Sequence, residues 1–340
     1  MKVKQFPDRK ITIDNESYLY FGGTAYLGLP NHKKFQKLLI KNIKRWGTTY
    51  GSSRNANIKL TAYDEGEHFL ANFIEAEAAV TVSSGMLAGK LIIEAISPLT
   101  DCFFYLPDTH TALKSQNSLP FFIDGKINPR LTNTTTEKIT ILTDAVPSFN
   151  LEAIDLSILE KISPYKEITL IIDESHSLGI LGKNGCGIFS STNYPNIKRK
   201  IMLSSLGKSF GLTGGVIAAD RDFINLIKET DSFVSSAGMN PAFVQTIADA
   251  QSIYFQQHKK LQKKLEYIYS KIKQNKNIDF NPKYPVIYPK IEGIQKKLHE
   301  EKIIVTHFKY TNLKEDLYRI VFTANHKKND LDKIIAILNR

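Results

Sequence analysis

Two short polar segments, each directly after an apolar run, hold the residues of this sequence that are best suited to chemistry. The segment 173–177 (Asp-Glu-Ser-His-Ser) follows the mainly apolar residues 168–172. The segment 204–211 (Ser-Ser-Leu-Gly-Lys-Ser-Phe-Gly) follows the apolar residues 201–203. Each run is typical of a buried strand in a parallel sheet, so both segments are expected at the ends of strands.

A carboxylate and a lysine in such positions suit a cofactor that is held as a Schiff base. Lys208 has small residues around it, and Asp173 would keep a pyridine nitrogen protonated so that the ring can accept electrons. This combination predicts pyridoxal 5′-phosphate (PLP) chemistry. The alternatives are an ordinary surface lysine and a helix N-cap aspartate, and they fit less well because His176 accompanies both residues.

The bulk composition favours an intracellular globular protein. The chain has 340 residues, of which 42% are hydrophobic and 23% charged, and it has two cysteines without metal-ligand spacing. We expect an N-terminal segment (1–35), a large domain (36–225) and a small domain (226–340). No apolar run is long enough to cross a bilayer and no signal-peptide core is apparent, so we expect a cytoplasmic location.

The formal net charge of +11 allows two interpretations. It could serve nucleic acid, or acidic partners such as coenzyme A or an acyl carrier protein. Many of the lysines lie in residues 259–276, where they alternate with apolar residues at helical spacing. We interpret this stretch as the solvated face of an amphipathic helix and expect no nucleic-acid binding, because no nucleic-acid motif accompanies the charge.

Apolar periodicity predicts an α/β fold: a mostly parallel sheet with helices on both faces, followed by a smaller C-terminal α+β domain. The expected strands of the first part are 79–82, 102–106, 138–142, 170–172 and 201–203, and its expected helices are 32–46, 62–74, 87–96 and 151–162. A hairpin is expected over 11–21, and the C-terminal part should contain strands at 285–288, 303–308 and 318–322 and a helix at 329–338. Ligands of such sheets bind beyond the carboxyl ends of the strands, where the polar candidates of this sequence also fall.

Six segments, in this order, resemble the α-oxoamine synthases, a family of fold-type I PLP enzymes. They cover most of the chain, from residue 18 to residue 339, and together they are specific although each alone is weak. The segments are 25–29 (Ala-Tyr-Leu-Gly-Leu), 51–54 (Gly-Ser-Ser-Arg), 83–85 (Ser-Ser-Gly), 173–185 with its Asp-Glu-Ser-His-Ser start, 207–211 (Gly-Lys-Ser-Phe-Gly) and 322–326 (Phe-Thr-Ala-Asn-His).

The resemblance assigns four residues to the catalytic centre. It implies that Lys208 carries the cofactor and later moves the substrate's α-proton, and that Asp173 pairs with the pyridine nitrogen. His176 corresponds to the histidine that bonds the cofactor's phenolic oxygen, and His110 to the one that stacks on the ring.

The resemblance also implies how the rest of the cofactor is bound. Ser84, Gly85 and Met86 would open a helix whose amides bind the phosphate, and Ser205 would add a hydroxyl. Ser148 corresponds to a serine near the phenolic oxygen. Ser236 resembles a residue that the family supplies from the neighbouring subunit, which implies a homodimer with a shared active site.

Two departures from the family concern the substrate. Thr24 replaces an asparagine ahead of the Tyr-Leu-Gly-Leu segment, and residues 306–310 replace an Arg-Pro-Pro segment whose arginine pairs with the substrate carboxylate. His307, Lys309 or Arg54 would then have to hold that carboxylate. Arg319 also matches a family position, but a structural role is as good an interpretation there.

The implied reaction condenses an amino acid with an acyl thioester of coenzyme A or a carrier protein, with loss of carbon dioxide, to an α-amino ketone. L-Alanine and a pimeloyl thioester, as in the 8-amino-7-oxononanoate synthase reaction of biotin biosynthesis, are the expected substrates. Glycine C-acetyltransferase, a serine or cysteate acyltransferase of lipid synthesis, and a PLP aminotransferase are the alternative enzymes. A regulatory paralogue and a basic nucleic-acid binder are the alternatives without catalysis.

Overall fold

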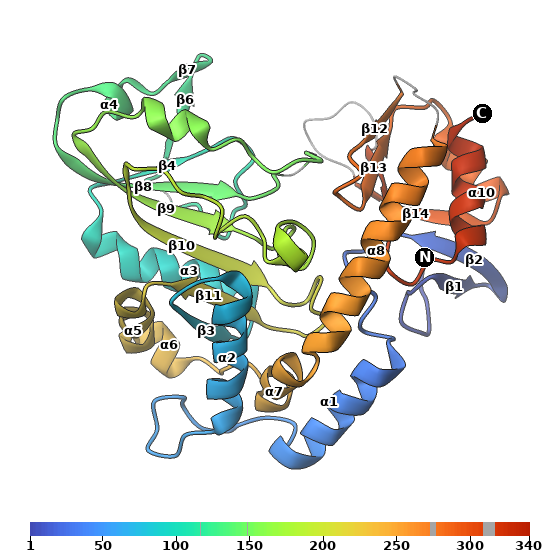
Figure 1. Cartoon of the computed structure of the whole chain (residues 1–340), viewed down its shortest axis with the longest axis horizontal. Coiled ribbons are helices and arrows are strands. Elements are labelled where there is room, and N and C mark those ends of the chain that lie inside the picture. The colour runs from blue at the N-terminus through green and yellow to red at the C-terminus, as the bar shows by residue number, and fades with distance from the viewer. Residues whose placement is uncertain (116, 148, 273–276, 309–316) are drawn as a thin grey trace.

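Two β-sheets with their covering helices make up the molecule (Figure 1). The structure is a computed structural model, and it describes residues 1–115, 117–147, 149–272, 277–308 and 317–340. A large sheet occupies one side of Figure 1 and a smaller sheet the other, and the long helix α8 (Gln251–Lys271) runs between them.

The large sheet has seven strands in the described part of the chain, in the order β3-β11-β10-β9-β8-β4-β5. Neighbours from β10 to β5 are parallel, and β11 is antiparallel to both β10 and β3. The strands are β3 (Ala78–Val82), β4 (Cys102–Tyr105), β5 (Leu119–Pro120), β8 (Glu137–Asp144), β9 (Lys166–Asp173), β10 (Ile197–Ser205) and β11 (Gly215–Ala219). The predicted mostly parallel sheet is therefore confirmed.

Both faces of the large sheet are covered. Ile171 packs with α3 and α5 on one face, whereas its neighbours Leu170 and Ile172 belong to a second cluster on the other face. Helices α2, α7 and α8 pack on the second face near β10 and β11. This burial explains why the strands read as continuous apolar runs.

The helices begin and end at residues that satisfy their terminal backbone groups. Ser84 caps α3 by accepting a hydrogen bond from the Leu87 amide (3.1 Å), and α1 ends at Gly47, whose φ is +78°. The helices are α1 (Lys33–Trp46), α2 (Thr61–Ile74), α3 (Gly85–Ile96), α4 (Pro129–Thr132), α5 (Arg221–Glu229), α6 (Asp231–Ser235), α7 (Pro241–Asp249), α8, α9 (Ile294–Glu300) and α10 (Lys328–Leu338). Short 3₁₀ turns occupy Ser97–Leu99, Ser157–Lys161 and Lys183–Gly185.

The smaller sheet joins the two ends of the chain. Its described strands lie in the order β1-β2-β14-β15-β13-β12, and β2 pairs in parallel with β14. The strands are β1 (Lys10–Ile13), β2 (Glu16–Phe21), β12 (Ile278–Phe280), β13 (Val286–Pro289), β14 (Ile303–Phe308) and β15 (Leu317–Val321), while β6 (Phe122–Ile123) and β7 (Lys126–Ile127) form a separate pair. The predicted N-terminal hairpin is confirmed, with Asp14 and Asn15 at positive φ (48° and 66°) as a two-residue hairpin turn requires.

The structure differs from the predictions at one helix and at several strands that were not expected. The helix expected over 151–162 is wrong, because only Ser157–Lys161 forms a 3₁₀ turn. Tertiary pairing holds the backbone ahead of it in another path, since the Ile154 amide bonds to the Ala145 carbonyl (2.9 Å) and Asp155 accepts from the Ser157 amide (2.9 Å). One of the unexpected strands is β11, which is fully buried.

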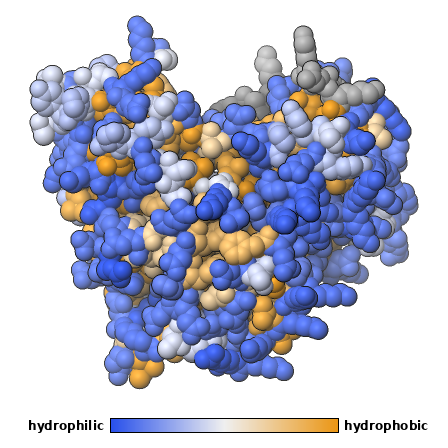
Figure 2. All heavy atoms as spheres, viewed as in Figure 1, coloured by the Kyte–Doolittle hydropathy of each residue, from blue (hydrophilic) through white to orange (hydrophobic). Residues whose placement is uncertain are grey.

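Figure 2 shows mainly hydrophilic residues on one face of the molecule, with hydrophobic residues gathered near its centre, where α2 and α8 lie in Figure 1. In the described ranges, none of the helices combines the length and the apolar character that a membrane span needs.

Candidate active site

The carboxyl ends of β9 and β10 bring the two polar segments together. These strands are parallel neighbours, and Leu203 of β10 lies opposite Asp173 of β9. Lys208 follows β10 in a tight turn, where the Gly211 amide bonds to the Lys208 carbonyl (3.3 Å). Gly211 has a φ of +68°, and a Cβ there would lie 2.9 Å from Leu29 Cβ, so the turn depends on glycine.

Lys208 is hydrogen bonded to His176. The Lys208 Nζ lies 2.9 Å from His176 Nε2, and the Tyr26 hydroxyl lies 2.9 Å from the other ring nitrogen, Nδ1. Burial lowers the pKa of His176 well below its usual value, and the positive charges of Lys208, Arg319 and His110 act in the same direction. Burial also lowers the pKa of Lys208, although Asp173 and Asp144 oppose this effect. A lysine with a lowered pKa is a better nucleophile and proton carrier near neutral pH.

Asp173 is a buried carboxylate at the end of β9, 7% exposed. In the described part of the chain its carboxylate accepts one hydrogen bond, from the Ser175 amide (2.8 Å). The Ser175 hydroxyl in turn accepts from the Ser205 amide (2.8 Å), which ties the two strand ends together. Asp173 therefore retains acceptor capacity for a cationic group beside Lys208.

Ser84 and Gly85 lie beside Ser205. The first turn of α3 begins at Gly85, where an added Cβ would lie 3.0 Å from both Cα and Cβ of Ser205. At Gly215 an added Cβ would lie 2.4 Å from the Ser84 carbonyl oxygen. The two glycines let the α3 amino end approach the end of β10 closely. Amides at the positive end of this twelve-residue helix suit a phosphate, and the exposed Met86 lies in the same turn.

His110 is anchored to the end of β8. Its backbone amide donates to Asp144 Oδ1 (2.9 Å), and its Nδ1 accepts from the Ala112 amide (3.1 Å). Its side chain is exposed, and it is close enough to His176 to affect that residue's pKa. An exposed ring at this edge is available to a planar ligand.

Three of the predicted residues are not placed with this group. Ser148 and Lys309 lie outside the described residues. Ser236 caps the end of α6, where its hydroxyl donates to the Phe233 carbonyl (3.4 Å). Its predicted role in a neighbouring subunit's site stays a prediction.

Arg54 is engaged elsewhere. Its guanidinium binds both oxygens of Glu67 (2.5 and 3.1 Å), donates to the Thr81 carbonyl (3.0 Å) and lies 3.8 Å from the centre of the Tyr63 ring. These contacts occupy the guanidinium N–H groups that a two-point hydrogen bond to a substrate carboxylate would need. The structure therefore favours a structural role for Arg54 and does not support it as a carboxylate ligand.

His307 faces away from Thr306 and Arg319. Thr306 pairs with Arg319 across β14 and β15, and His307 pairs with Tyr318, so the two pairs lie on opposite faces of the sheet. His307 is exposed, and its ring centre lies 6.1 Å from that of Tyr318. This placement does not support His307 as the carboxylate ligand.

Arg319 lies on the same face of the small sheet as Thr306 and is close enough to Lys208 to affect its pKa. Its positive charge lowers the pKa of both Lys208 and His176, in addition to the larger effect of burial. Its guanidinium donates to the Gly23 carbonyl (3.2 Å), directly before the half-buried Thr24. The sequence shows that Arg319 matches a family position, and the strand register adds that its side chain lies on the same sheet face as Thr306.

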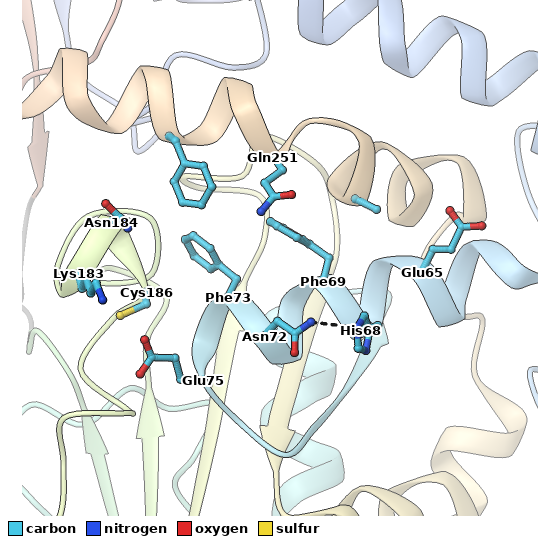
Figure 3. A pocket seen from close by; sticks show the side chains of 12 residues that line it. Glu65, His68, Phe69, Asn72, Phe73, Glu75, Lys183, Asn184, Cys186 and Gln251 are labelled. Carbon is cyan, nitrogen blue, oxygen red and sulfur yellow. Dashed lines mark hydrogen bonds between the residues drawn. The ribbon is translucent and has the colours of Figure 1, made fainter.

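A cavity of about 440 Å³ lies away from all of these residues. Figure 3 shows it between α2, α8 and the 183–186 turn, with Phe69 and Phe73 on its wall and Lys183 at one side. It contains none of the predicted site residues, so we do not interpret it as the catalytic site.

The residues at the sheet edge fit PLP. A buried carboxylate with remaining acceptor capacity, a lysine with a lowered pKa and a glycine-lined helix end are the groups that a pyridine nitrogen, an aldehyde and a phosphate require. Lys208, Asp173 and His176 would hold the ring, and the start of α3 with Ser205 would hold the phosphate.

Comparison with known proteins points in the same direction. The profile of the family described as "Aminotransferase class I and II" matches residues 151–338. An 8-amino-7-oxononanoate synthase of Petrotoga mobilis is 28% identical over 95% of this chain and 88% of its own length. A serine palmitoyltransferase of Sphingobacterium spiritivorum is 26% identical over 74% of this chain and 65% of its own length.

A solved structure supports the fold. A serine palmitoyltransferase variant from S. paucimobilis, with a bound PLP–myriocin aldimine, superimposes with a TM-score of 0.82 and 16% identity. The superposition covers 99% of this chain and 91% of that chain.

Proposed function

Because this chain belongs to the aminotransferase class I and II family, as a PLP-dependent enzyme of the α-oxoamine synthase type, we propose that it joins L-alanine to a pimeloyl thioester. The observation that carries the choice is the match to relatives named 8-amino-7-oxononanoate synthase over nearly the whole chain. Serine palmitoyltransferases match a smaller part of the sequence, about 70–74% of it. Palmitoyl transfer to serine is therefore the second candidate.

The proposed reaction forms one carbon–carbon bond. The α-carbon of alanine loses a proton and attacks the thioester carbonyl, and the thiol leaves. Carbon dioxide then departs from the former α-carbon, which regains a proton. The products are the amino ketone, carbon dioxide and the free thiol of coenzyme A or of a carrier protein.

Bound PLP supplies the electron sink for the charge that develops on the α-carbon. Lys208 holds the cofactor before the substrate arrives and then moves the α-proton at its Nζ. Its burial supports this role because the lowered pKa leaves a larger neutral fraction at neutral pH. Asp173 would keep the pyridine nitrogen protonated, and His176 would bond the phenolic oxygen from the side that faces Lys208.

Arg319 is the cation that we assign to the carboxylate of the amino acid. It is half-buried, it lies opposite Thr306, and its charge lowers the pKa of both Lys208 and His176. This assignment replaces Arg54 and His307, whose side chains are engaged or directed elsewhere. Lys309, outside the described residues, is not needed for it.

The remaining roles follow the same placement. His110 would stack on the ring, and Ser84, Gly85, Met86 and Ser205 would bind the phosphate. A homodimer would add Ser236 from the neighbouring subunit. The acyl chain would reach the site as a coenzyme A or carrier-protein thioester, which the positive net charge of +11 favours because both donors are acidic.

Thiol release by the PLP-loaded protein tests the proposal. Alanine, glycine, serine and cysteate are each paired with acetyl, pimeloyl and palmitoyl thioesters, with K208A as the control. Release that requires alanine and the pimeloyl donor is the expected result. Release that requires serine and the palmitoyl donor would replace our choice with the second candidate, and silence across the grid with PLP bound would exclude both.

A further inference from the structure

Tyr26 is a completely buried residue of the segment 25–29, which carries part of the family resemblance. Its side chain is 0% exposed, and it comes from the chain that leads out of β2. Its hydroxyl lies 2.9 Å from His176 Nδ1, on the far side of the imidazole from Lys208. His176 therefore connects the Tyr26 hydroxyl to Lys208 Nζ, the nitrogen that carries the proposed chemistry.

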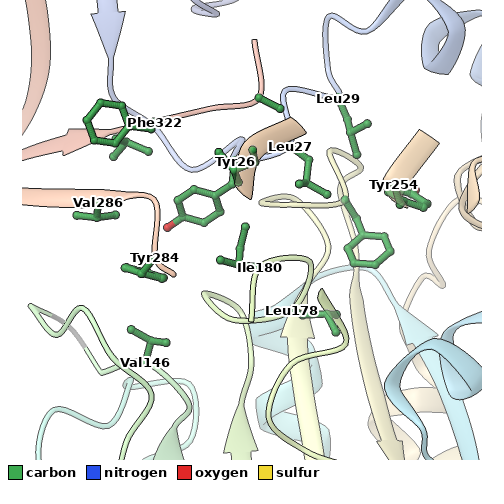
Figure 4. Packing of buried hydrophobic residues seen from close by; sticks show 14 of the residues in the cluster. Tyr26, Leu27, Leu29, Val146, Leu178, Ile180, Tyr254, Tyr284, Val286 and Phe322 are labelled. Carbon is green, nitrogen blue, oxygen red and sulfur yellow. The ribbon is translucent and has the colours of Figure 1, made fainter. Parts of the chain in front are cut away.

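Tyr284 is the second partner of the Tyr26 hydroxyl. It precedes β13 in the small sheet, is almost fully buried, and shares a side-chain hydrogen bond with Tyr26. Figure 4 shows Tyr26 between Ile180 on one side and Val286 of β13 and Phe322, which follows β15, on the other, with its hydroxyl directed towards Tyr284. The two ring centres are 6.3 Å apart.

Burial raises the pKa of Tyr26, so its hydroxyl keeps a proton that it can donate to a neighbouring acceptor. His176 Nδ1 lies within hydrogen-bond distance of that hydroxyl. Burial lowers the pKa of His176 well below its usual value, and the nearby basic groups Lys208, Arg319 and His110 act in the same direction. A buried imidazole in these surroundings is neutral and carries one proton, so the hydrogen bond at one nitrogen decides the state of the other.

We propose that Tyr26 is a positioning residue that donates to Nδ1 of His176 and thereby holds this histidine as the tautomer with its proton on Nε2. Nε2 is the nitrogen that faces Lys208, whose pKa is lowered by burial, and the neutral form of this amine can accept from the Nε2 proton. Lys208 is the residue to which the cofactor attaches, so the inference rests on the proposed function in this respect. The arrangement presents a fixed N–H donor at the attachment point. The Tyr284 bond extends this control to the small sheet, which also carries Arg319.

The chain Tyr284–Tyr26–His176–Lys208 joins three parts of the fold. Tyr26 and His176 are 150 positions apart in the sequence, and Tyr26 and Tyr284 belong to the same hydrophobic core cluster. A buried hydroxyl that lost its partner would be costly, so each member favours one arrangement of the next. We therefore expect a movement of the small sheet to change the hydrogen bonding of His176.

Nitrogen-15 NMR of histidine-labelled protein tests the proposal directly. The His176 signal is identified by its absence in H176N, and tautomers are distinguished in the PLP-free and PLP-loaded full-length chain. We expect an unprotonated Nδ1 and a protonated Nε2 in the wild type, and loss of this single state in Y26F. A wild-type spectrum with the proton on Nδ1, or a Y26F spectrum with the tautomer unchanged, would overturn the proposal.

Tyr254 provides the matched control. It is 2% exposed, and its hydroxyl has no hydrogen-bond partner among the described residues, so Y254F removes a buried hydroxyl without touching His176. We expect the wild-type tautomer of His176 in Y254F. We expect Y284F to shift the tautomer less than Y26F does, and Y284F replaces Y26F as the test variant if Y26F folds poorly. An equal effect in Y254F and Y26F would reduce Tyr26 to a packing residue and reject the proposal.

PLP affinity, measured by equilibrium titration of the visible absorbance, is the second readout. We expect Y26F to bind PLP about tenfold more weakly, as loss of one hydrogen-bond network member predicts, and Y254F to match the wild type. A wild-type protein that binds no PLP would refute the proposed function. The tautomer in the PLP-free protein would still test Tyr26, so the two failures are distinguishable.

Discussion

Asp144 and Asp173 lie directly opposite each other at the carboxyl ends of the parallel strands β8 and β9. Both are buried, at 6% and 7% exposed. Burial, with the nearby charge of Asp173, raises the pKa of Asp144 to about 8. The pair therefore does not carry two negative charges at neutral pH, which leaves one carboxylate to face Lys208.

The Asp144 carboxyl predicts a pH-dependent stability. Its folded pKa of about 8 exceeds its ordinary value of 3.8, so the folded state keeps a proton that the unfolded state releases. The free energy of unfolding should therefore fall as pH rises from about 4 to about 8. D144N keeps an acceptor for the His110 amide and should reduce this fall.

Urea unfolding of the PLP-free protein at pH 5 and pH 8 measures the difference. Burial also raises the pKa of Glu174, to about 7, and this residue contributes to the fall in both proteins. The comparison of D144N with the wild type therefore isolates Asp144. Parallel pH profiles of the two proteins would contradict the prediction.

Replacement of Lys208 should abolish both cofactor attachment and turnover. K208A should lack the visible absorbance of the attached cofactor and should retain less than about one thousandth of the activity, as expected when a residue serves as both nucleophile and proton carrier. The control is K259A, which removes an exposed lysine of α8. Undiminished thiol release by K208A would remove Lys208 from the reaction.

The strand-end rule explains why the centre of the site could be predicted from sequence. Apolar runs before Asp173 and Lys208 indicate neighbouring parallel strands, and such strands end at one edge of a sheet. His176 follows Asp173 by three residues, so its placement comes with the same turn. No tertiary information is needed for these three residues.

The residues whose roles the sequence left open depend on long-range contacts and strand register. Arg54 is in a matching motif, but the fork of its guanidinium is used by Glu67, a partner on another element. Arg319 shares a sheet face with Thr306 because β15 pairs with β14 in one register, and a shift of one residue would place it on the other face. The Tyr26–His176 bond likewise joins segments that no local pattern connects.

The ion pair between Arg54 and Glu67 predicts a large effect on stability. Both side chains are nearly buried, and Glu67 also accepts from the Thr81 amide (2.7 Å), so removal of one charge leaves the other uncompensated. E67Q should lower the free energy of unfolding by about 3–5 kcal/mol. Urea unfolding measures the change.

The control for E67Q is the exposed pair of Lys302 and Glu16, at 55% and 52% side-chain exposure. E16Q should change the free energy of unfolding by less than about 1 kcal/mol, since surface ion pairs contribute little. An E67Q protein as stable as E16Q would show that the Arg54 contacts are not important for folding.

Replacement of Arg319 should selectively weaken the binding of the amino-acid substrate. A charge-assisted hydrogen bond contributes about 1.5–3 kcal/mol, so R319Q should raise the KM for the amino acid about 10- to 150-fold. The KM for the acyl thioester should change much less, because that substrate does not contact this guanidinium in our assignment. R319K should be intermediate at best, since it retains the charge without the fork.

R199Q is the matched control for R319Q. Arg199 lies on β10 and pairs with Asp220 (2.8 Å), and both side chains are partly exposed. Its loss should leave both KM values unchanged. Because Arg319 also bonds the Gly23 carbonyl, thermal unfolding of R319Q must accompany the kinetics. Equal rises in both KM values, or a loss of stability without any change in KM, would assign Arg319 to the fold and not to the substrate.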